Sequence, residues 1–319
     1  MPDAGHEETD VLLARIERKV EKVYRKAVVE SRDKLNEYLK KYKADDEKKR
    51  EAVKSGDLSE EAYQKWRKDH MIKGKQYQDM LDVLTDDYVN ADKIAMSIVN
   101  EYTPEAYAIN RNYAAFEIEK GLQIDTSFTL YDRQTVERLI REKEILLPKP
   151  RVDIPKDRRW NRQHIRDQIT QGVLQGDSIP NIAKRLQKVA QMDKAAAIRN
   201  ARTAVTGAEN AGRVDGYKRA QEMGIDLQQE WLASLDMKTR HSHRQMDGVR
   251  VNVGQKFPNG LRYPGDPEGP PEEVYNCRCT LVAALTGFDF SGMPRRNKLN
   301  GMSYEEWKRE KKNGTNSEN

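Results

Sequence analysis

The sequence predicts an α+β protein that is mostly α-helical, with long N-terminal helices and a small C-terminal antiparallel β element packed on helices. Of the 319 residues, 34% are charged and only 37% are hydrophobic. In the first half, apolar side chains recur every three or four residues, which is the helical period. After Gly224 this period gives way to alternation between Gly and Pro turns, which is typical of short strands. The length allows two domains, each with its own core.

Four helices are expected in the N-terminal half. The first carries a narrow apolar stripe that includes Leu12, Ile16 and Val20 between dense Lys, Arg and Glu. Ser59 is the expected N-cap of the second helix. Pro104 suits the first turn of the third, where a proline costs no hydrogen bond. The four helices are expected over residues 10–54, 59–102, 103–121 and 132–144.

Prolines separate the two halves of the chain. Pro148, Pro150 and Pro155 oppose helix formation and predict a linker over residues 148–157. Asp193 is the expected N-cap of a long helix that ends at Gly224. The helices expected beyond the linker cover residues 158–175, 178–190 and 194–223, and the strands cover 227–235, 249–253 and 279–284.

These elements predict four segments. Residues 1–147 form an elongated charged helical region, residues 148–157 a linker, residues 158–290 a module of helices with a small β element, and residues 291–319 a basic flexible tail. Because the N-terminal apolar stripe is narrow, those helices bury little alone. We expect them to pack on each other or on another subunit.

The composition also bears on the compartment. The chain has no run of about 18 apolar residues and begins with an acidic stretch, so neither a membrane span nor a signal peptide is expected. Cys277 and Cys279, the only two cysteines, are separated by one residue, and alternate side chains of an extended segment point apart. We therefore expect no disulfide and a reducing compartment.

A polar stripe runs along the helix after Asp193. Its members are spaced four, three, four and three residues apart, so they share one face. One interpretation is an ordinary solvated face. The other is a buried hydrogen-bonded seam, in which Asp236 and Asp247 receive Arg199 and Arg213 and every polar group needs a partner. The stripe consists of Arg199, Thr203, Thr206, Asn210 and Arg213.

An ordered set of motifs resembles a known family. The set comprises Ala201-Arg202-Thr203, Asn210-Ala211-Gly212-Arg213, Trp231, Asp236-Met237-Lys238-Thr239-Arg240-His241-Ser242-His243-Arg244, Asp247-Gly248, Pro264-Gly265 and Asn276-Cys277-Arg278-Cys279. In order and spacing it resembles the phage head morphogenesis family (minor head proteins, Mu F-like) over about residues 158–285. The N-terminal half is similar to that family only in being long, charged and helical.

The resemblance implies a non-enzymatic minor head protein of a tailed phage or prophage. Such proteins occur in few copies and associate with the portal vertex, and some bind DNA and influence its packaging or ejection. The implied partners are the portal protein, a scaffold or major capsid protein, and double-stranded DNA, with no membrane. The implied location is the virion, in the capsid interior or at the portal vertex, and the host cytoplasm during assembly.

Within this module we expect a polar core that organises the helix and the β element. Its expected members are Arg199, Thr203, Asn210, Arg213, Asp236, Arg240, His243 and Asp247.

Two cysteines and two histidines form a candidate zinc site. Members of the resembled family carry Cys-x-x-Cys at the positions of Arg240 and His243, whereas this chain offers His241, His243, Cys277 and Cys279. Two thiolates and two imidazoles could hold Zn²⁺ tetrahedrally. In a strand, however, His241 and His243 would point to opposite faces. The alternative is that the cysteines are small packing residues and His243 is a hydrogen-bonded core histidine.

Enzymatic interpretations are weaker. A Cys with a nearby His suggests a thiol nucleophile, and His-x-His with Asn and Cys suggests a metal-dependent nuclease. The sequence shows no helix N-terminus or sharp turn that would lower a thiol pKa. A nuclease would also need several convergent ligands. We therefore expect no enzymatic activity.

A basic middle region supports a different class of function. Residues 148–220 carry 16 Lys and Arg against 7 Asp and Glu. Such an excess can neutralise phosphates without reading sequence, so the alternative to a head protein is a non-specific DNA-binding or DNA-processing protein. Ordinary helix surface charge, or contact with an acidic portal, would explain the same excess. The candidate DNA-contacting residues are Arg158, Arg159, Arg162, Arg166, Lys184, Arg185 and Lys188.

Overall fold

The computed structural model describes residues 3–72, 74–142, 145, 147–175, 177–287 and 297–315. Contacts divide the chain into two compact units. The first, which we call the sheet unit, consists of residues 1–17, 98–150 and 199–319. The second, which we call the helical unit, consists of residues 18–97 and 151–198. Three long helices contribute residues to both units: α1 (Ala4–Ser55), α3 (Lys75–Leu122) and α6 (Ile179–Glu222).

These two units differ from the consecutive segments that the prolines predict. The start of α1 and residues 98–150 lie in the sheet unit together with the C-terminal residues. Helix α5 (Ile154–Leu174) also begins inside the expected linker. Pro155 lies in its first turn, where the missing N–H has no helical partner to lose, and Asp153 accepts a hydrogen bond from the Lys156 N–H at 3.1 Å. Whether residues 158–290 fold as an independent domain remains a prediction.

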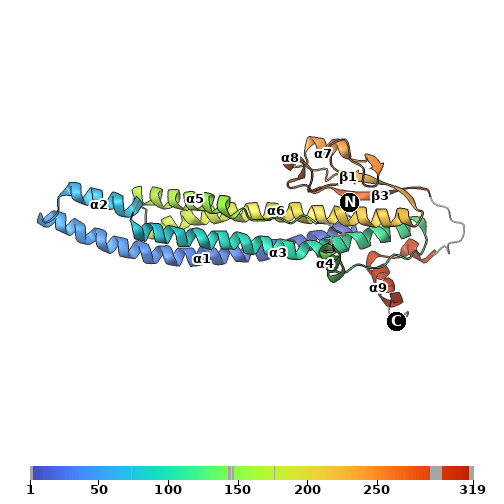
Figure 1. Cartoon of the computed structure of the whole chain (residues 1–319), viewed down its shortest axis with the longest axis horizontal. Coiled ribbons are helices and arrows are strands. Elements are labelled where there is room, and N and C mark those ends of the chain that lie inside the picture. The colour runs from blue at the N-terminus through green and yellow to red at the C-terminus, as the bar shows by residue number, and fades with distance from the viewer. Residues whose placement is uncertain are drawn as a thin grey trace. The chain divides into compact units, whose positions relative to one another are not determined.

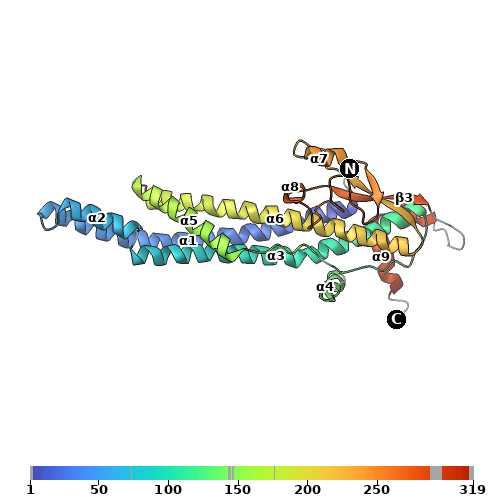
Figure 2. The same ribbon diagram turned by 45° about the horizontal axis from the view of Figure 1, so that its top comes forward.

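The helical unit is built from amphipathic helices, as the apolar period predicts. It contains α2 (Glu60–Ile72), α5 and parts of α1, α3 and α6, and Figure 2 shows α5 beside α3. Ser59 caps α2 as predicted, because its Oγ accepts a hydrogen bond from the Ala62 N–H at 3.2 Å. Larger core side chains of this unit include Val20, Tyr24, Leu35, Leu39, Tyr77, Leu81, Leu84, Tyr88, Ile165, Ile169, Leu186 and Val189. No described helix of the chain is long and apolar enough to cross a membrane.

Pro104 does not begin a helix, which corrects the sequence prediction. It lies inside α3, which starts at Lys75, and the chain instead breaks after α2 ends at Ile72. Proline cannot donate the hydrogen bond that the carbonyl of residue i−4 would accept in a helix. Here the Thr103 hydroxyl donates to that carbonyl, Asn100 O, at 3.2 Å. The side chain before the proline thus compensates for the missing donor.

Asp193 is not an N-cap either. Helix α6 runs without interruption from Ile179 to Glu222 and replaces the two shorter helices that the sequence predicts. Asp193 lies within it and is buried. Burial, with the charges of Asp92 and Asp157 nearby, raises the pKa of Asp193 to about 8. Aspartate is disfavoured in the interior of a helix and favoured at its N-cap. An aspartate in a helical sequence is therefore predicted as a cap even when, as here, it is a buried mid-helix carboxyl.

The sheet unit contains the predicted antiparallel sheet. Its strands are β1 (Asp226–Leu232), β2 (Arg250–Asn252) and β3 (Thr280–Gly287), in the order β2-β1-β3. Gln229 of β1 pairs with Val251 on one side and with Ala283 on the other. Figure 1 shows the sheet beside the C-terminal part of α6. The α+β class is therefore confirmed.

An apolar core joins the sheet to the helices of its unit. Trp231 is fully buried and meets Phe257 edge to face, with ring centroids 5.1 Å apart, a favourable aromatic geometry. The loop that carries Pro264-Gly265 approaches α6 closely: a Cβ at Gly207 would lie 2.7 Å from Gly265 O. Gly265 has a φ of +77°, which favours glycine. Only glycine at both positions allows this contact between loop and helix.

Four short helices and one 3₁₀ turn complete the sheet unit. Asp132 caps α4 by accepting a hydrogen bond from the Thr135 N–H at 2.8 Å; the end of this predicted helix, at residues 143 and 144, lies outside the described residues. The elements are α4 (Arg133–Arg141), α7 (His241–Met246), α8 (Pro271–Val274), η1 (Asn297–Gly301) and α9 (Tyr304–Thr315).

The described part of the expected flexible tail is packed, which corrects that prediction. Trp307 of α9 is 1% exposed. Its Nε1–H donates to Glu119 Oε2 of α3 at 2.7 Å, and Lys311 Nζ donates to Glu119 Oε1 at 2.8 Å. Trp307 and the buried ring of Tyr304 anchor a helix that is otherwise rich in basic and polar residues. Residues 291–296 and 316–319 of the predicted tail lie outside the described residues.

Asp193→Asn should stabilise the protein increasingly as the pH rises from about 4 to about 8. The pKa of Asp193 in the folded chain is raised from 3.8 to about 8, so the folded chain holds this proton more tightly than the unfolded chain does. The stability that the proton contributes is complete below the ordinary pKa and is lost as the pH rises through 8. The asparagine carries no charge at any pH. We expect its advantage in unfolding free energy to grow by ~2 kcal/mol or more over this range, measured by denaturant titration.

Asp45→Asn is the matched control, because Asp45 is an exposed aspartate of the same unit. Its difference from the native chain should stay flat with pH. A flat difference for Asp193→Asn as well would contradict the raised pKa.

Candidate functional site

The polar stripe of α6 faces the backbone that leads into β3. Thr203 Oγ1 accepts a hydrogen bond from the Asn276 N–H at 3.2 Å, and the Thr206 hydroxyl donates to Cys277 O at 2.9 Å. Both bonds join a helix side chain to the backbone of the Asn-Cys-Arg-Cys segment (residues 276–279). From Thr203 onward the stripe is therefore a hydrogen-bonded seam and not a solvated face, whereas Arg199 at its start is exposed.

Two further members of the stripe continue the same row along β3. Asn210 donates through Nδ2 to Cys279 O at 3.3 Å and accepts at Oδ1 from the Leu281 N–H at 2.9 Å. Arg213 Nη1 donates to Leu281 O at 2.8 Å. We call these contacts of Thr203, Thr206, Asn210 and Arg213 the α6–β3 seam.

Helix and strand dimensions explain why the seam stays in register. Ten residues of α6, from 203 to 213, advance by about 15 Å. The chain from 277 to 281, which follows Asn276 in the left-handed conformation (φ +56°), advances by at most about 13 Å. Side chains three or four apart on the helix therefore meet successive backbone groups along the strand. The edge of β3 away from β1 is satisfied by side chains in place of another strand.

Arg213 also organises a buried charge network. Its side chain is fully buried, and Nη2 pairs with Asp3 Oδ1 at 2.7 Å while Nε donates to Asn110 Oδ1 at 3.1 Å. Burial alone would raise the pKa of Asp3, but the Arg213 charge and hydrogen bond outweigh burial and lower it. The guanidinium therefore joins the N-terminal residues, α3, α6 and β3.

Glu209 brings a second N-terminal residue into this network. Its Oε1 lies 2.8 Å from His6 Nδ1, accepts from the Thr280 hydroxyl at 2.9 Å and lies 3.8 Å from Arg213 Nη2. Burial lowers the pKa of His6, but the hydrogen bond and charge of Glu209 outweigh it and raise the pKa to about 9. His6 is thus an imidazolium at neutral pH, so each buried carboxylate here has a cationic partner.

The other expected members of the polar core lie nearer the surface. Arg199 is exposed and Asp236 and Asp247 are exposed as well, so the expected pairs of Arg199 and Arg213 with these aspartates do not form. Asp236 pairs with Arg278, which lowers the pKa of Asp236. Asp247 accepts from the Ala233 N–H at 2.9 Å. Asp236 and Asp247 thus make local contacts within the β element and do not pair with the arginines of α6.

Three of the four candidate metal ligands come together. His243 of α7 is buried, and its Nδ1 lies 3.5 Å from Cys277 Sγ and 3.4 Å from Cys279 Sγ. The three ligand atoms all lie within 4.8 Å of one another. His241 is exposed and outside this group, because on a helix residues two apart face different directions. We call His243, Cys277 and Cys279 the thiol–imidazole cluster.

Arg240 and Glu273 border the thiol–imidazole cluster. Glu273 Oε2 lies 2.9 Å from His243 Nε2 and accepts from the Ser242 hydroxyl at 3.0 Å. Arg240 donates to Tyr275 O, just before the Asn-Cys-Arg-Cys segment. Both thiols are buried, and the hydrogen bonds from Cys277 and His243 lower the pKa of Cys279.

The segment that carries both the seam and the thiol–imidazole cluster matches a known family. Residues 163–282 match the family described as Phage Mu protein F like protein. We call residues 163–282, which are similar to this family, the Mu F-like segment. The resemblance predicted from the ordered motifs is therefore confirmed.

Similarity to a known head protein extends beyond the Mu F-like segment. The chain is 24% identical over 328 residues to minor head protein GP7 of Bacillus phage SPP1, covering 98% of this chain and 99% of that protein. It is also 30% identical over 151 residues to the NAD(+)--arginine ADP-ribosyltransferase EFV of Enterococcus faecalis, covering 46% of this chain and 31% of that protein. A third relative is the uncharacterized protein YqbB of Bacillus subtilis, 28% identical over 124 residues, covering 37% of this chain and 40% of that protein. No solved structure matches the chain significantly.

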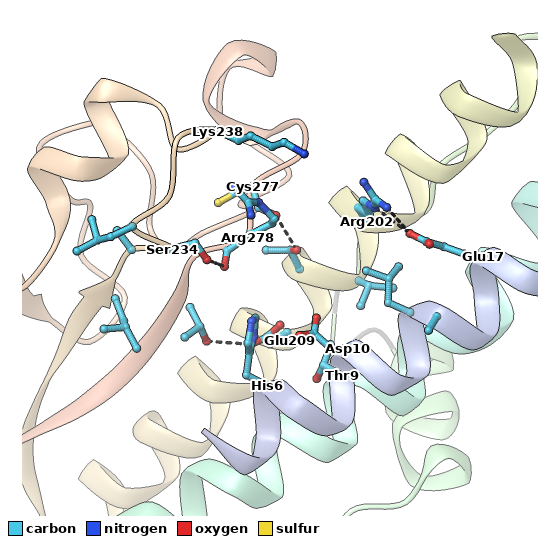
Figure 3. A pocket seen from close by; sticks show the side chains of 18 of the residues that line it. His6, Thr9, Asp10, Glu17, Arg202, Glu209, Ser234, Lys238, Cys277 and Arg278 are labelled. Carbon is cyan, nitrogen blue, oxygen red and sulfur yellow. Dashed lines mark hydrogen bonds and ion pairs between the residues drawn. The ribbon is translucent and has the colours of Figure 1, made fainter. Parts of the chain in front are cut away.

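A cleft of about 790 Å³ lies between the Mu F-like segment and the first turns of α1. Figure 3 shows His6, Thr9, Asp10 and Glu17 of α1 on one side and Ser234 and Lys238 on the other. Its volume suits a small ligand. Several of its charged groups, however, already pair within the protein: Arg202 Nε donates to Glu17 at 2.8 Å, and His6 contacts Glu209.

Two candidate DNA contacts are engaged inside the helical unit. Arg162 Nη1 donates to Asp82 Oδ1 at 2.6 Å, and Arg158 pairs with Asp86. Both aspartates lie on α3, so these arginines hold α5 against α3. Two of the basic residues counted in the middle of the sequence are thus neutralised by acidic residues 72 and 80 positions earlier in the chain.

The other five basic candidates fall into two groups. Arg185 pairs with Asp177 at 2.6 Å, and Arg166 lies 3.4 Å from the neighbouring Asp167. Within the described residues, no carboxylate pairs with the remaining three, which are exposed: Arg159, Lys184 and Lys188.

Several polar residues of the site were not predicted from the sequence, among them Asp3, His6, Glu209 and Glu273. Asp3 and His6 lie about 200 positions from their partners, and no local pattern indicates such contacts. Glu209 precedes Arg213 by four residues, and in a helix this spacing indicates that the two charged side chains can pair. Glu273, which contacts His243, lies in a short helix without a recognisable pattern.

Arg213→Met should destabilise the sheet unit by about 3–5 kcal/mol, because it leaves Asp3 as a largely buried charge without its cation and removes one of the two cations beside Glu209. Methionine nearly keeps the length and the apolar part of the side chain. Chemical denaturation monitored by circular dichroism would measure the loss.

Arg219→Met, on the same helix, is the matched control. Arg219 is about half exposed, and its pair with Glu222 is a surface pair, worth ~0.5 kcal/mol or less. Similar small effects of both substitutions would contradict the proposed importance of the buried network.

Proposed function

We propose that this protein is a minor head protein of a tailed phage or prophage. One observation carries the proposal: the similarity to minor head protein GP7 covers 98% of this chain and 99% of that protein. A match confined to the Mu F-like segment would support only a shared module. We further propose that the protein acts at the portal vertex, with the portal protein and a scaffold or major capsid protein as partners, in procapsid assembly, DNA packaging or DNA ejection.

The proposed role is structural and not enzymatic. The buried polar groups of the Mu F-like segment serve structural contacts: Asn210 binds the β3 backbone on both sides, and Arg213 binds that backbone and Asp3. A catalytic group needs an atom that is free to reach a substrate. The match to the ADP-ribosyltransferase covers 31% of that protein, so it supports a shared segment more than a shared activity.

Portal protein should copurify with this chain from a lysate of cells in which the phage is assembling. An affinity tag after residue 319 would allow recovery of the complex, and mass spectrometry would identify the partner. Cryo-electron microscopy of procapsids should then place the chain at the portal vertex.

Arg219→Met, which leaves the buried network intact, should copurify portal protein as the native chain does. Recovery of a tagged major capsid protein from the same lysate shows whether assembled heads are present. Absence of portal protein from the native sample, with heads recovered in that parallel sample, would contradict the proposed location.

DNA is proposed as an additional partner of the helical unit. Arg159, Lys184 and Lys188 are exposed and lie without a carboxylate partner among the described residues, so their charges are available to phosphates. A variant with all three replaced by Gln should bind duplex DNA more weakly. The slope of its log affinity against log salt should also fall by roughly one for each phosphate that is no longer neutralised. Electrophoretic shifts across a salt series would measure both.

A variant that replaces Arg18, Lys22 and Lys40 by Gln is the charge-matched control, because these residues of α1 are also exposed. Equal weakening by both triple variants would indicate a general charge effect. Binding by the native chain that is independent of salt would contradict the phosphate contacts.

A further inference from the structure

We propose that the thiol–imidazole cluster binds one zinc ion through His243 Nδ1, Cys277 Sγ and Cys279 Sγ. A non-protein ligand such as water would take the fourth position, since the described residues supply three ligand atoms in this group. This inference does not depend on the proposed function.

The distances between the ligand atoms fit a tetrahedral zinc ion. Zinc bonds of about 2.3 Å to sulfur and about 2.0 Å to nitrogen, at the tetrahedral angle, place nitrogen and sulfur about 3.5 Å apart. Nδ1 of His243 lies 3.5 Å from Cys277 Sγ and 3.4 Å from Cys279 Sγ. The two nitrogen–sulfur separations are therefore those that a shared ion requires, and all three ligand atoms lie within 4.8 Å of one another.

Hydrogen bonding alone does not account for this arrangement. One imidazole nitrogen has a single N–H or a single lone pair, which points well at one partner only. Here Nδ1 has two sulfurs at nearly equal distances. Thiols are weak hydrogen-bond donors and acceptors, so they gain little from such sharing. An ion among the three atoms would satisfy all of them together.

Glu273 orients the imidazole for metal binding. Its Oε2 lies 2.9 Å from Nε2 of His243 and also accepts from the Ser242 hydroxyl. A proton on Nε2, the nitrogen nearer this carboxylate, leaves the lone pair of Nδ1 directed at the two sulfurs. A carboxylate behind a metal-binding histidine commonly fixes the tautomer in this way.

Charge and chemistry favour zinc over harder cations. Two thiolates and a neutral imidazole carry two negative charges, and a divalent ion neutralises them in a buried site, where uncompensated charge is costly. Sulfur and imidazole ligands select zinc over magnesium or calcium, which prefer oxygen.

A bound ion would join parts of the Mu F-like segment that are distant in sequence. His243 lies on α7, whereas Cys277 and Cys279 lead into β3, 34 and 36 residues later. The ion would close a loop that includes β2 and α8 and would fix α7 to the sheet. We therefore expect zinc to raise the thermal unfolding midpoint of the full chain.

Elemental analysis of the full chain, purified without chelators, tests the proposal. We expect about one zinc per chain, and about one cobalt per chain after exchange, with the absorption bands of tetrahedral cobalt–thiolate coordination. Cys277→Ser and Cys279→Ser should each lose most of the metal and the zinc-dependent rise in unfolding temperature. His241→Gln should keep both, because His241 lies outside the cluster.

Two results would overturn the proposal. One is native chain that holds less than about a tenth of an equivalent of zinc and shows no cobalt–thiolate bands on titration. The other is a Cys277→Ser/Cys279→Ser double variant that retains zinc at the native stoichiometry, which would place the ion elsewhere. If the serine variants do not fold, the cobalt spectrum of the native chain decides, because its charge-transfer bands report sulfur ligands directly. Failure to copurify portal protein would leave all of these readouts unchanged.

Discussion

The sheet unit depends on how the free edge of β3 is satisfied. A further strand could have paired with that edge, but at Leu281 of β3, and at Cys277 and Cys279 just before the strand, side chains of α6 make the backbone hydrogen bonds in its place. Because each of these groups is buried, an unmade bond would cost its full desolvation energy. The position of the sheet on α6 is therefore fixed by a row of specific contacts as well as by apolar packing, which is less directional.

The buried charges extend this constraint to the rest of the unit. Arg213 contacts both β3 and Asp3, and Glu209 contacts both Thr280 and His6. The charged side chains of Arg213 and Glu209 thus each connect the sheet to the start of α1. The two cations, Arg213 and His6, and the two carboxylates, Asp3 and Glu209, form one buried network of charges. They differ from separate surface ion pairs because all four groups are largely removed from water.

Much of the fold follows from periodicity, and its exceptions have local physical causes. The apolar period predicts α1, and alternation predicts the three strands near their observed bounds. The prediction that a helix begins at Pro104 was wrong, because the Thr103 hydroxyl replaces the missing hydrogen-bond donor. The prediction that Asp193 is an N-cap was wrong, because Asp193 is a buried carboxyl within α6. At the site, spacing correctly placed Asn210 and Arg213 on one face. It could not identify Asp3 or His6, since contacts across about 200 residues leave no local pattern.

The contact between Asp3 and Arg213 has a consequence for biosynthesis. Residue 3 leaves the ribosome long before residue 213, and Lys308, which pairs with Glu8, is made 300 residues after its partner. The start of α1 must therefore wait, with its charged groups hydrated, until nearly the whole chain has been translated. Because bringing such distant segments together is slow, completion of the sheet unit is a late, post-translational event. During that interval the chain exposes the apolar surface that the finished unit covers, and such transiently exposed surface favours aggregation.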